Sequence, residues 1–194
     1  MIKLGVTGGI ASGKSVVASV FRTMGVPVYF TDDRAKELMV IDSGVKTDLI
    51  NLLGEDAYLP NGTLNKKKIA DFLFANKENA NLINQIVHPR VKSDFMRWAS
   101  MHEENNEPLV VMECAILIEA NFLDAVDKSI LVYAPLDVRI NRAIARDNST
   151  KELIERRIKA QFPEEEKIAR VDYVIHNDGN HLLLPQIMHI LDQL

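Results

Sequence analysis

One short segment constrains the fold of this chain more than any other feature. Residues 8–15, Gly-Gly-Ile-Ala-Ser-Gly-Lys-Ser, fit the phosphate-loop pattern of spaced glycines followed by Lys and Ser. The apolar run Ile2–Thr7 before them predicts a buried strand, and Lys14–Met24 after them has apolar residues at helical spacing, stopped by Gly25. Glycines let backbone N–H groups surround a phosphate, and the helix that follows directs its positive end at the same anion. The segment therefore predicts a strand, a loop and a helix arranged around a nucleotide phosphate.

Four further apolar runs alternate with helical patterns along the chain. They are Pro27–Phe30, Leu109–Glu113, Ser129–Tyr133 and Tyr173–His176. Near-continuous aliphatic strands separated by helices predict a parallel sheet that is covered on both faces. Together with the first run, they predict a doubly wound α/β sandwich with a five-stranded parallel sheet.

Two stretches fall outside this alternation. Residues 60–100 hold no strand-like run, and their apolar spacing predicts a helical insert whose helices are broken at His88-Pro89. Residues 139–170 carry six of the ten arginines of the chain. We therefore expect a single domain: a nucleotide-binding core, about 1–59, 101–138 and 171–194, with an insert at about 60–100 and an arginine-rich segment at about 139–170.

The composition excludes several classes of protein. The chain has 194 residues, of which 47% are hydrophobic, enough for a self-sufficient core. No run of about 20 apolar residues predicts a membrane-spanning helix, and the N-terminus shows no secretory leader. The single cysteine, Cys114, excludes a disulfide framework and a cysteine-based zinc site. We therefore expect a cytoplasmic protein, and the net charge of −4 argues against a nucleic-acid partner.

Lys14 and Ser15 give the loop its expected chemistry. The ammonium of Lys14 suits the β- and γ-phosphates of a nucleoside triphosphate, and the hydroxyl of Ser15 suits Mg²⁺. The base-recognition motif of guanine-nucleotide switches, Asn-Lys-x-Asp, finds no match, because Asn65-Lys66 is followed by two more lysines. A motor or remodelling ATPase normally needs more chain than this one has. The residues therefore favour a small kinase that phosphorylates a soluble metabolite.

Two carboxylates could serve phosphoryl transfer, and each also has a purely structural explanation. Asp32 follows the run Pro27–Phe30, where an Asp can either orient an attacking hydroxyl or cap a helix. Its neighbour Asp33 is the better candidate for the helix start. Glu113 ends its apolar run, and it either lies near Mg²⁺, through water, or is a surface residue at the end of a strand.

A stripe of arginines is the third such feature. Arg139, Arg142 and Arg146 share one helical face, which either covers a triphosphate or is simply solvated. The sequence offers them no acidic partner at matching spacing, so we expect a mobile segment whose arginines are mostly exposed without ligand. The apolar residues expected to pack on the opposite side are Leu136, Ile140, Ala143 and Ile144.

Segments along almost the whole chain resemble the dephospho-coenzyme A kinase family. In chain order they are Thr7-Gly8-Gly9-Ile10-Ala11-Ser12-Gly13-Lys14-Ser15, Asp32-Asp33-Arg34-Ala35-Lys36, Leu64-Asn65-Lys66, Ile86-Val87-His88-Pro89, Glu113-Cys114-Ala115-Ile116-Leu117-Ile118-Glu119, Arg142 with Arg146-Asp147, Ala160-Gln161 and Asn177-Asp178-Gly179. Four positions depart from the family pattern. Phe30 stands where an acidic residue is common, Lys66 replaces an Arg, Glu113 an Asp and Ala115 a Pro.

The resemblance implies a P-loop kinase-like three-layer sandwich with a helical substrate-binding insert and an arginine-bearing lid. It implies transfer of the γ-phosphoryl group of ATP to the ribose 3′-hydroxyl of dephospho-coenzyme A, the last step of coenzyme A synthesis. The substrates would be ATP and dephospho-coenzyme A, and the cofactor Mg²⁺. No nucleic-acid, membrane or obligatory protein partner is implied.

The resemblance also implies roles for particular residues. Asp32, Lys14, Arg142 and Arg146 would be catalytic. Asp32 and His88 would contact the substrate, and Ser15 and Glu113 would contact the metal. The residues implied for ATP binding are Gly9, Ile10, Ala11, Ser12, Gly13, Lys14, Ser15, Val16 and Asn177.

Two alternatives stay open at this point. Another phosphate-loop kinase, acting on a nucleoside, nucleotide or small hydroxyl metabolite, would share residues 8–15. It would not require Asp32 and Ala35 together with His88-Pro89 and residues 113–119. A nucleotide-dependent switch or binding protein would instead lose ATP slowly, respond to a protein partner and accept no metabolite.

Overall fold

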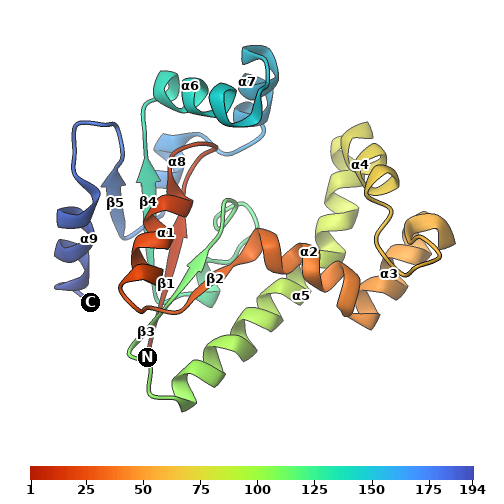
Figure 1. Cartoon of the computed structure of the whole chain (residues 1–194), viewed down its shortest axis with the longest axis horizontal. Coiled ribbons are helices and arrows are strands. Elements are labelled where there is room, and N and C mark those ends of the chain that lie inside the picture. The colour runs from red at the N-terminus through yellow and green to blue at the C-terminus, as the bar shows by residue number, and fades with distance from the viewer. The chain divides into compact units, whose positions relative to one another are not determined.

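The structure, a computed structural model, describes residues 1–194 and contains a five-stranded sheet in which all strands are parallel (Figure 1). In spatial order the strands are β2 (Val28–Phe30), β3 (Leu109–Glu113), β1 (Ile2–Thr7), β4 (Lys128–Tyr133) and β5 (Tyr173–His176). All five predicted strands are therefore confirmed, with shifts of one residue at the starts of β2 and β4.

The sheet forms because its strands are aliphatic on both faces. Helices α1 (Lys14–Thr23) and α9 (Leu183–Leu191) cover one face with buried apolar side chains. That core comprises Leu4, Val6, Val17, Phe21, Leu109, Val111, Ile130, Val132, Ile175, Ile187 and Ile190. Gly5, between two of these residues on β1, faces the other side, where Leu117 packs so closely that a Cβ at Gly5 would lie 2.8 Å from its Cδ2. The predicted α/β class is confirmed.

The chain divides into two compact units. The sheet unit comprises Met1–Phe30 and Trp98–Leu194, and the helical unit comprises Thr31–Arg97. The helical unit contains α2 (Thr31–Ile41), α3 (Ser43–Leu53), α4 (Lys66–Ala75) and the first three-quarters of α5 (Lys77–Glu104), with a 3-10 turn at Glu55–Ala57. Its buried side chains include Leu38, Val45, Leu49, Ile69, Ile83, Val87 and Val91.

Helix α5 corrects one expectation from the sequence, because it runs through His88-Pro89 without a break. Proline in a helix removes one backbone hydrogen bond and usually kinks or ends the helix. Here the buried residues Ile83, Val87 and Val91 hold one face of α5 in the core, while Pro89 lies on the exposed side. Packing of the apolar face therefore outweighs the local preference of the proline.

The arginine-rich stretch forms three helices of the sheet unit. They are α6 (Leu136–Asp147), α7 (Lys151–Lys159) and α8 (Glu164–Ile168). Ile140, Ala143 and Ile154 form a small core of their own, against which Ile10 and Ile144 pack. Leu136, which the sequence assigned to the packed face, is 53% exposed, so that assignment was wrong.

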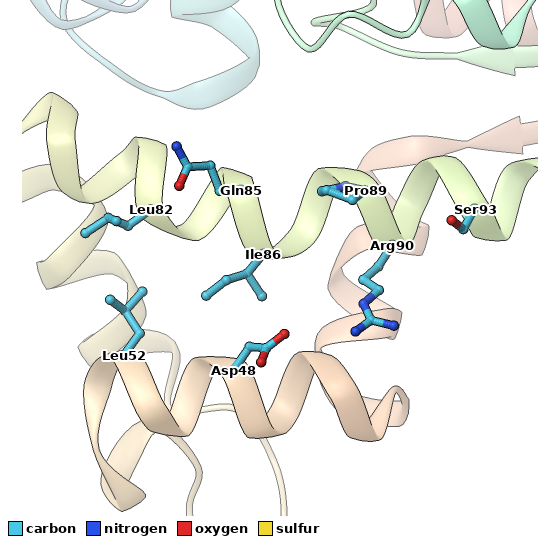
Figure 2. A pocket seen from close by; sticks show the side chains of 8 residues that line it. All are labelled: Asp48, Leu52, Leu82, Gln85, Ile86, Pro89, Arg90 and Ser93. Atoms are coloured by element: carbon cyan, nitrogen blue, oxygen red, sulfur yellow. The ribbon is translucent and has the colours of Figure 1, made fainter.

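The helical unit has a hollow of about 540 Å³ between α3 and α5 (Figure 2). Asp48 and Leu52 line it from α3, and Leu82, Ile86 and Arg90 face them from α5.

None of the helices combines the length and the apolar character that crossing a membrane requires.

Candidate active site

The phosphate loop has a backbone that only glycine adopts easily. Gly13, the N-cap of α1, has φ 98° and ψ 17°, which is left-handed, and its carbonyl accepts the N–H groups of Val16 and Val17 at 2.9 and 3.1 Å. The side chain of Asn177 packs directly against Gly13, where a Cβ would collide with its Nδ2. The same Nδ2 donates to the carbonyl of Ser12 at 2.7 Å. Asn177, just past the end of β5, therefore fixes the turn into α1.

Lys14, Ser15 and Glu113 form a compact cluster at the end of the loop. Nζ of Lys14 lies 3.1 Å from Oε1 of Glu113, and the hydroxyl of Ser15 donates to the same oxygen at 2.8 Å. The side chain of Glu113 is only 4% exposed, and that of Lys14 is 17% exposed. The register of the sheet places Glu113 beside Val6 of β1 and Phe30 of β2. The structure thus brings together the ammonium, hydroxyl and carboxylate that the sequence selected, and the surface explanation of Glu113 is wrong.

Two of the predicted arginines border the loop. Arg142 and Arg146 line a hollow of about 250 Å³ together with loop residues, namely Gly9, Ala11, Gly13, Lys14, Ser15 and Val16. A guanidinium N–H of Arg142 donates to the carbonyl of Asn177 at 2.9 Å. Arg146 is exposed and donates to Asp147 at 2.7 Å, and Arg157 donates to the same carboxylate at 2.7 Å. These two guanidinium groups lower the pKa of Asp147 to about 2.

Arg139 corrects the expectation of an exposed, unpaired stripe. It is 4% exposed and pairs with Glu164 of α8 at 3.3 Å. Burial raises the pKa of Glu164, although the positive charge of Arg139 opposes that shift. A Cβ at Gly9 would collide with the guanidinium and would come within 2.5 Å of the carboxylate. The pair therefore packs against the phosphate loop. The arginines do have acidic partners that their spacing did not reveal: Glu164 of α8 for Arg139, and Asp147 for Arg146.

Sequence reasoning gave no role to Gln161, although it contacts the loop directly. Its Oε1 accepts the N–H of Ile10 at 2.9 Å, and its Nε2 donates to the carbonyl of Ala115 at 3.4 Å. Gln161 belongs to one of the segments that carry the family resemblance, and that was the available signal. The loop is therefore held by Asn177 at one end and by Gln161 and the Arg139–Glu164 pair at the other.

The remaining predicted residues, Asp32 and His88, lie in the helical unit. Helix α2 begins at Thr31, so Asp32 and Asp33 both lie in its first turn, and both are exposed. Asp33 lies at the helix start, as expected for it, and pairs with Lys36 at 3.0 Å. His88 is half-buried on α5, and burial lowers its pKa.

Together, the parallel sheet, the phosphate loop, the Lys14–Glu113 pair and the bordering arginines define a nucleotide-dependent kinase of the P-loop class. Solved kinases share this fold: shikimate kinase from Acinetobacter baumannii aligns with a TM-score of 0.57 at 15% identity, over 100% of this chain and 92% of that one.

Comparison with known proteins narrows the class to one family. The dephospho-CoA kinase family pattern matches residues 2–182. A dephospho-CoA kinase of Bacteroides fragilis is 46% identical over 190 residues, 98% of this chain and 91% of that protein. One of Porphyromonas gingivalis is 39% identical over 193 residues, 99% of this chain and 94% of that protein. The chain belongs to the dephospho-CoA kinase family.

Two solved structures share the fold of this chain over almost its whole length. The crystal structure of TT1252 from Thermus thermophilus is 32% identical and has a TM-score of 0.83, covering 100% of this chain and 97% of that one. The dephospho-CoA kinase from Campylobacter jejuni, at 19% identity and a TM-score of 0.72 over 98% and 96% of the two chains, has the same fold.

Proposed function

We propose that this chain transfers the γ-phosphoryl group of ATP to the ribose 3′-hydroxyl of dephospho-coenzyme A, which yields coenzyme A and ADP. Family membership supports this activity, and it makes the chain an enzyme of coenzyme A biosynthesis. The observation that carries the proposal is the Lys14–Glu113–Ser15 cluster at the phosphate loop, an arrangement with a clear use only when a polyphosphate is bound.

The loop and its arginines supply the charge that phosphoryl transfer needs. Such transfer depends on in-line positioning and on neutralising charge on the transferring group rather than on covalent help from the protein. When ATP binds, Lys14 exchanges its contact with Glu113 for the β- and γ-phosphates. Arg142 and Arg146, which border the same hollow, then neutralise the equatorial oxygens and exclude water from them.

The residues that would hold Mg²⁺ are Ser15 and Glu113. Their hydroxyl and carboxylate oxygens are hard ligands of the kind that Mg²⁺ prefers, and they already lie 2.8 Å apart. No three His, Cys, Asp or Glu side chains of the chain gather into a metal site. Mg²⁺ would therefore take most of its ligands from the ATP phosphates and from water, and when bound it neutralises charge on those phosphates.

Asp32 and His88 serve the acceptor in this proposal. The carboxylate of Asp32 follows the carboxyl end of β2, the edge at which parallel α/β sheets bind their ligands. It accepts a hydrogen bond from the 3′-hydroxyl and orients that oxygen for attack, or takes its proton. Burial lowers the pKa of His88 and so favours its neutral imidazole, which contacts the substrate as a hydrogen-bonding group.

An ADP-release assay tests the proposal directly. Purified protein is supplied with ATP, Mg²⁺ and dephospho-coenzyme A, and the product is identified as coenzyme A by mass spectrometry. Adenosine and AMP are the matched acceptors, because they carry the same ribose without the rest of the substrate. Turnover with dephospho-coenzyme A, but not with adenosine or AMP, supports the proposal. Preference for adenosine or AMP identifies a different small-molecule kinase, and ATP loss without any phosphorylated acceptor contradicts a kinase function.

A further inference from the structure

One buried ion pair of the helical unit has no role in the mechanism above. Asp94, on α5, is 7% exposed, and Arg34, on α2, donates to it from two nitrogens. Nε of Arg34 lies 2.6 Å from Oδ2 of Asp94, and Nη2 lies 3.0 Å from Oδ1. A buried carboxylate is tolerated only when it is paired, so this contact is a specific tie between α2 and α5.

The guanidinium of Arg34 has no freedom left to turn. Its third nitrogen, Nη1, lies 2.7 Å from Oε2 of Glu37, one turn further along α2. The hydrogen bonds to Asp94 and then to Glu37 raise the pKa of Arg34, so the group stays charged. Two parallel bonds between planar groups fix their orientation as well as their distance, which a lysine ammonium cannot do. The pair therefore restricts the rotation of α2 and not only its separation from α5.

The position of Arg34 on α2 shows what the pair replaces. Thr31, Arg34 and Leu38 lie three and four residues apart and so share one side of the helix. Thr31 and Leu38 are buried, but no large apolar side chain lies between them on this side, where Ala35 is the other residue. Packing alone therefore holds the first turn of α2 weakly, at the end of the helix that is most prone to fray.

Asp32 lies in this same first turn. It precedes Arg34 by two residues, so the two side chains point to nearly opposite sides of the helix, about 200° apart. A side chain of an α-helix reaches about 5–6 Å from the axis, so a rotation of about 10° moves a carboxylate at that radius by about 1 Å. A misplacement of about 1 Å in a reacting group can lower a rate about 10²-fold.

We propose that Arg34 and Asp94 are positioning residues for phosphoryl transfer. Their paired bonds fix the rotation of the first turn of α2 and so hold the carboxylate of Asp32 in the orientation that meets the acceptor hydroxyl. This role rests on the proposed function, which places Asp32 at that hydroxyl.

Arg34→Met tests the role by removing the charge and keeping the length of the side chain. The kcat with dephospho-coenzyme A should fall about tenfold or more, while the KM for ATP stays unchanged because the phosphate loop belongs to the sheet unit. Arg97→Met is the matched control. Arg97 also contacts Oδ1 of Asp94, at 3.4 Å, but it lies on α5 itself and does not tie α2. Its kinetics should equal those of the wild type.

Two further variants separate positioning from folding. Arg34→Met combined with Asp94→Leu leaves no unpaired charge in the unit and should fold, but its kcat should stay low because apolar contacts do not fix rotation. Arg34→Lys keeps the charge without the parallel bonds and should recover kcat only in part. Full recovery of kcat in either variant would contradict the positioning role.

A double-mutant cycle with Asp32→Asn decides whether the pair acts through Asp32. In the Asp32→Asn background, adding Arg34→Met should change the remaining kcat less than about twofold, because the group being positioned is already gone. A pair that merely supports the fold would lower kcat by the same factor in both backgrounds. That result would overturn the proposal.

Hydrogen exchange of the full chain without substrates tests the tie independently of activity. The amides of residues 35–37 donate to carbonyls of the first turn, and they should exchange faster in Arg34→Met than in the wild type or in Arg97→Met. Unchanged exchange would mean that the pair does not hold this turn, which would overturn the proposal.

The proposed function and the positioning role fail in different ways. A wild type that does not phosphorylate dephospho-coenzyme A contradicts the proposed function, whatever the exchange of residues 35–37. An active wild type whose kcat is unaffected by Arg34→Met contradicts the positioning role alone.

Discussion

At the scale of single residues, the phosphate loop depends on side chains that arrive from distant parts of the sequence. Asn177 packs against Gly13, and the Arg139–Glu164 pair packs against Gly9. The phosphate-loop pattern itself was predictable, because glycine, lysine and serine at this spacing have one main use. The side chains that hold the loop were not predictable from the sequence. A contact between residues more than a hundred positions apart follows from the strand order and not from local spacing.

Gly13→Ala tests how tightly Asn177 holds the loop. The variant has two sources of strain, a φ of +98° and a collision between Cβ and Nδ2 of Asn177. Gly25→Ala is a matched control, because its φ is +87° and nothing lies within 4 Å of the added Cβ. We expect Gly25→Ala to lose about 1 kcal/mol of unfolding free energy and Gly13→Ala about 1–3 kcal/mol more, measured by urea denaturation. Equal losses would mean that Asn177 yields without cost.

Lys14→Ala tests the cluster at the loop. In the proposed function the ammonium makes the charge-assisted contact to the transferring phosphate, so its loss should lower turnover about 10²-fold or more. Glu113 keeps the hydroxyl of Ser15 as a donor, and the fold should stay intact by circular dichroism. Lys151→Ala, an exposed lysine in the same unit, should be active. Near-normal turnover in a folded Lys14→Ala protein would contradict the kinase assignment.

The adjacent carboxylates Asp32 and Asp33 should differ in kinetics although both are exposed in the first turn of α2. Asp32→Asn should lower kcat about 10²-fold or more with little change in ATP affinity, because in the proposed function its carboxylate acts on the acceptor hydroxyl. Asp33→Asn loses only an exposed pair with Lys36, worth a few tenths of a kcal/mol of stability. Steady-state kinetics with dephospho-coenzyme A distinguish them, and an equal or larger loss of kcat at Asp33 would reverse the assignment.

At the scale of elements, the strands were predictable and some helix details were not. Near-continuous aliphatic runs such as Leu109–Glu113 have few alternatives to a buried parallel strand. The break expected at Pro89 failed because the buried face of α5 outweighs one lost hydrogen bond. Arg139 was misjudged for a related reason: helical spacing shows which residues share a face, but not whether that face meets an acidic residue such as Glu164.

The segment α6–α8 should therefore move only in part when ligands bind. Its base is tied down, because Arg139 pairs with Glu164, Lys167 lies 3.1 Å from Glu119, and Gln161 bonds Ile10. Its far end, around Asp147 and the start of α7, is exposed. Hydrogen exchange of residues 147–157 should slow when ATP and dephospho-coenzyme A are both present, as the arginines close on the triphosphate. Residues 161–168 should exchange slowly with or without ligands.

Uniform slowing over the whole segment 139–170 would show that its base moves as well. No slowing anywhere in it would contradict the lid. Exchange in β3, which is buried throughout, and in residues 4–7 of β1, which are also buried, serves as the internal control and should not change.

At the scale of the whole molecule, the sequence predicted the sheet, the helical character of residues 60–100 and the family, and the structure adds where the loop supports come from. The cluster of Lys14, Ser15 and Glu113 could be anticipated because strand ends of a parallel sheet meet at one edge. A hollow of about 1040 Å³ between α2, α4 and the connection before α4 could not be anticipated, because its lining comes from three separate segments and no local pattern marks a cavity.

Stability of the whole chain should depend on pH through His88. Burial lowers its pKa below 6.5, so below pH 6.5 the unfolded chain binds more protons at this residue than the folded chain does. The free energy of unfolding should therefore fall as pH decreases through this window and should be independent of His88 above it. Burial raises the pKa of Glu164, so this residue lowers the free energy of unfolding as pH rises above about 4.5. The wild type by itself would therefore show a mixture of both effects.

Comparison with His88→Gln isolates the contribution of the imidazole. Urea denaturation of both proteins, at a series of pH values from about 5 to 8, gives the difference between their free energies of unfolding. This difference should be constant above the unperturbed pKa of about 6.5 and should shift in favour of the variant below it. An imidazole titration by NMR on the folded wild type should give a midpoint below 6.5. The opposite result is a difference in unfolding free energy that is constant over the whole pH range, together with a titration midpoint at or above 6.5. It would show that burial does not lower the pKa of His88, and the neutral hydrogen-bonding role proposed for this residue toward the substrate would fail as well.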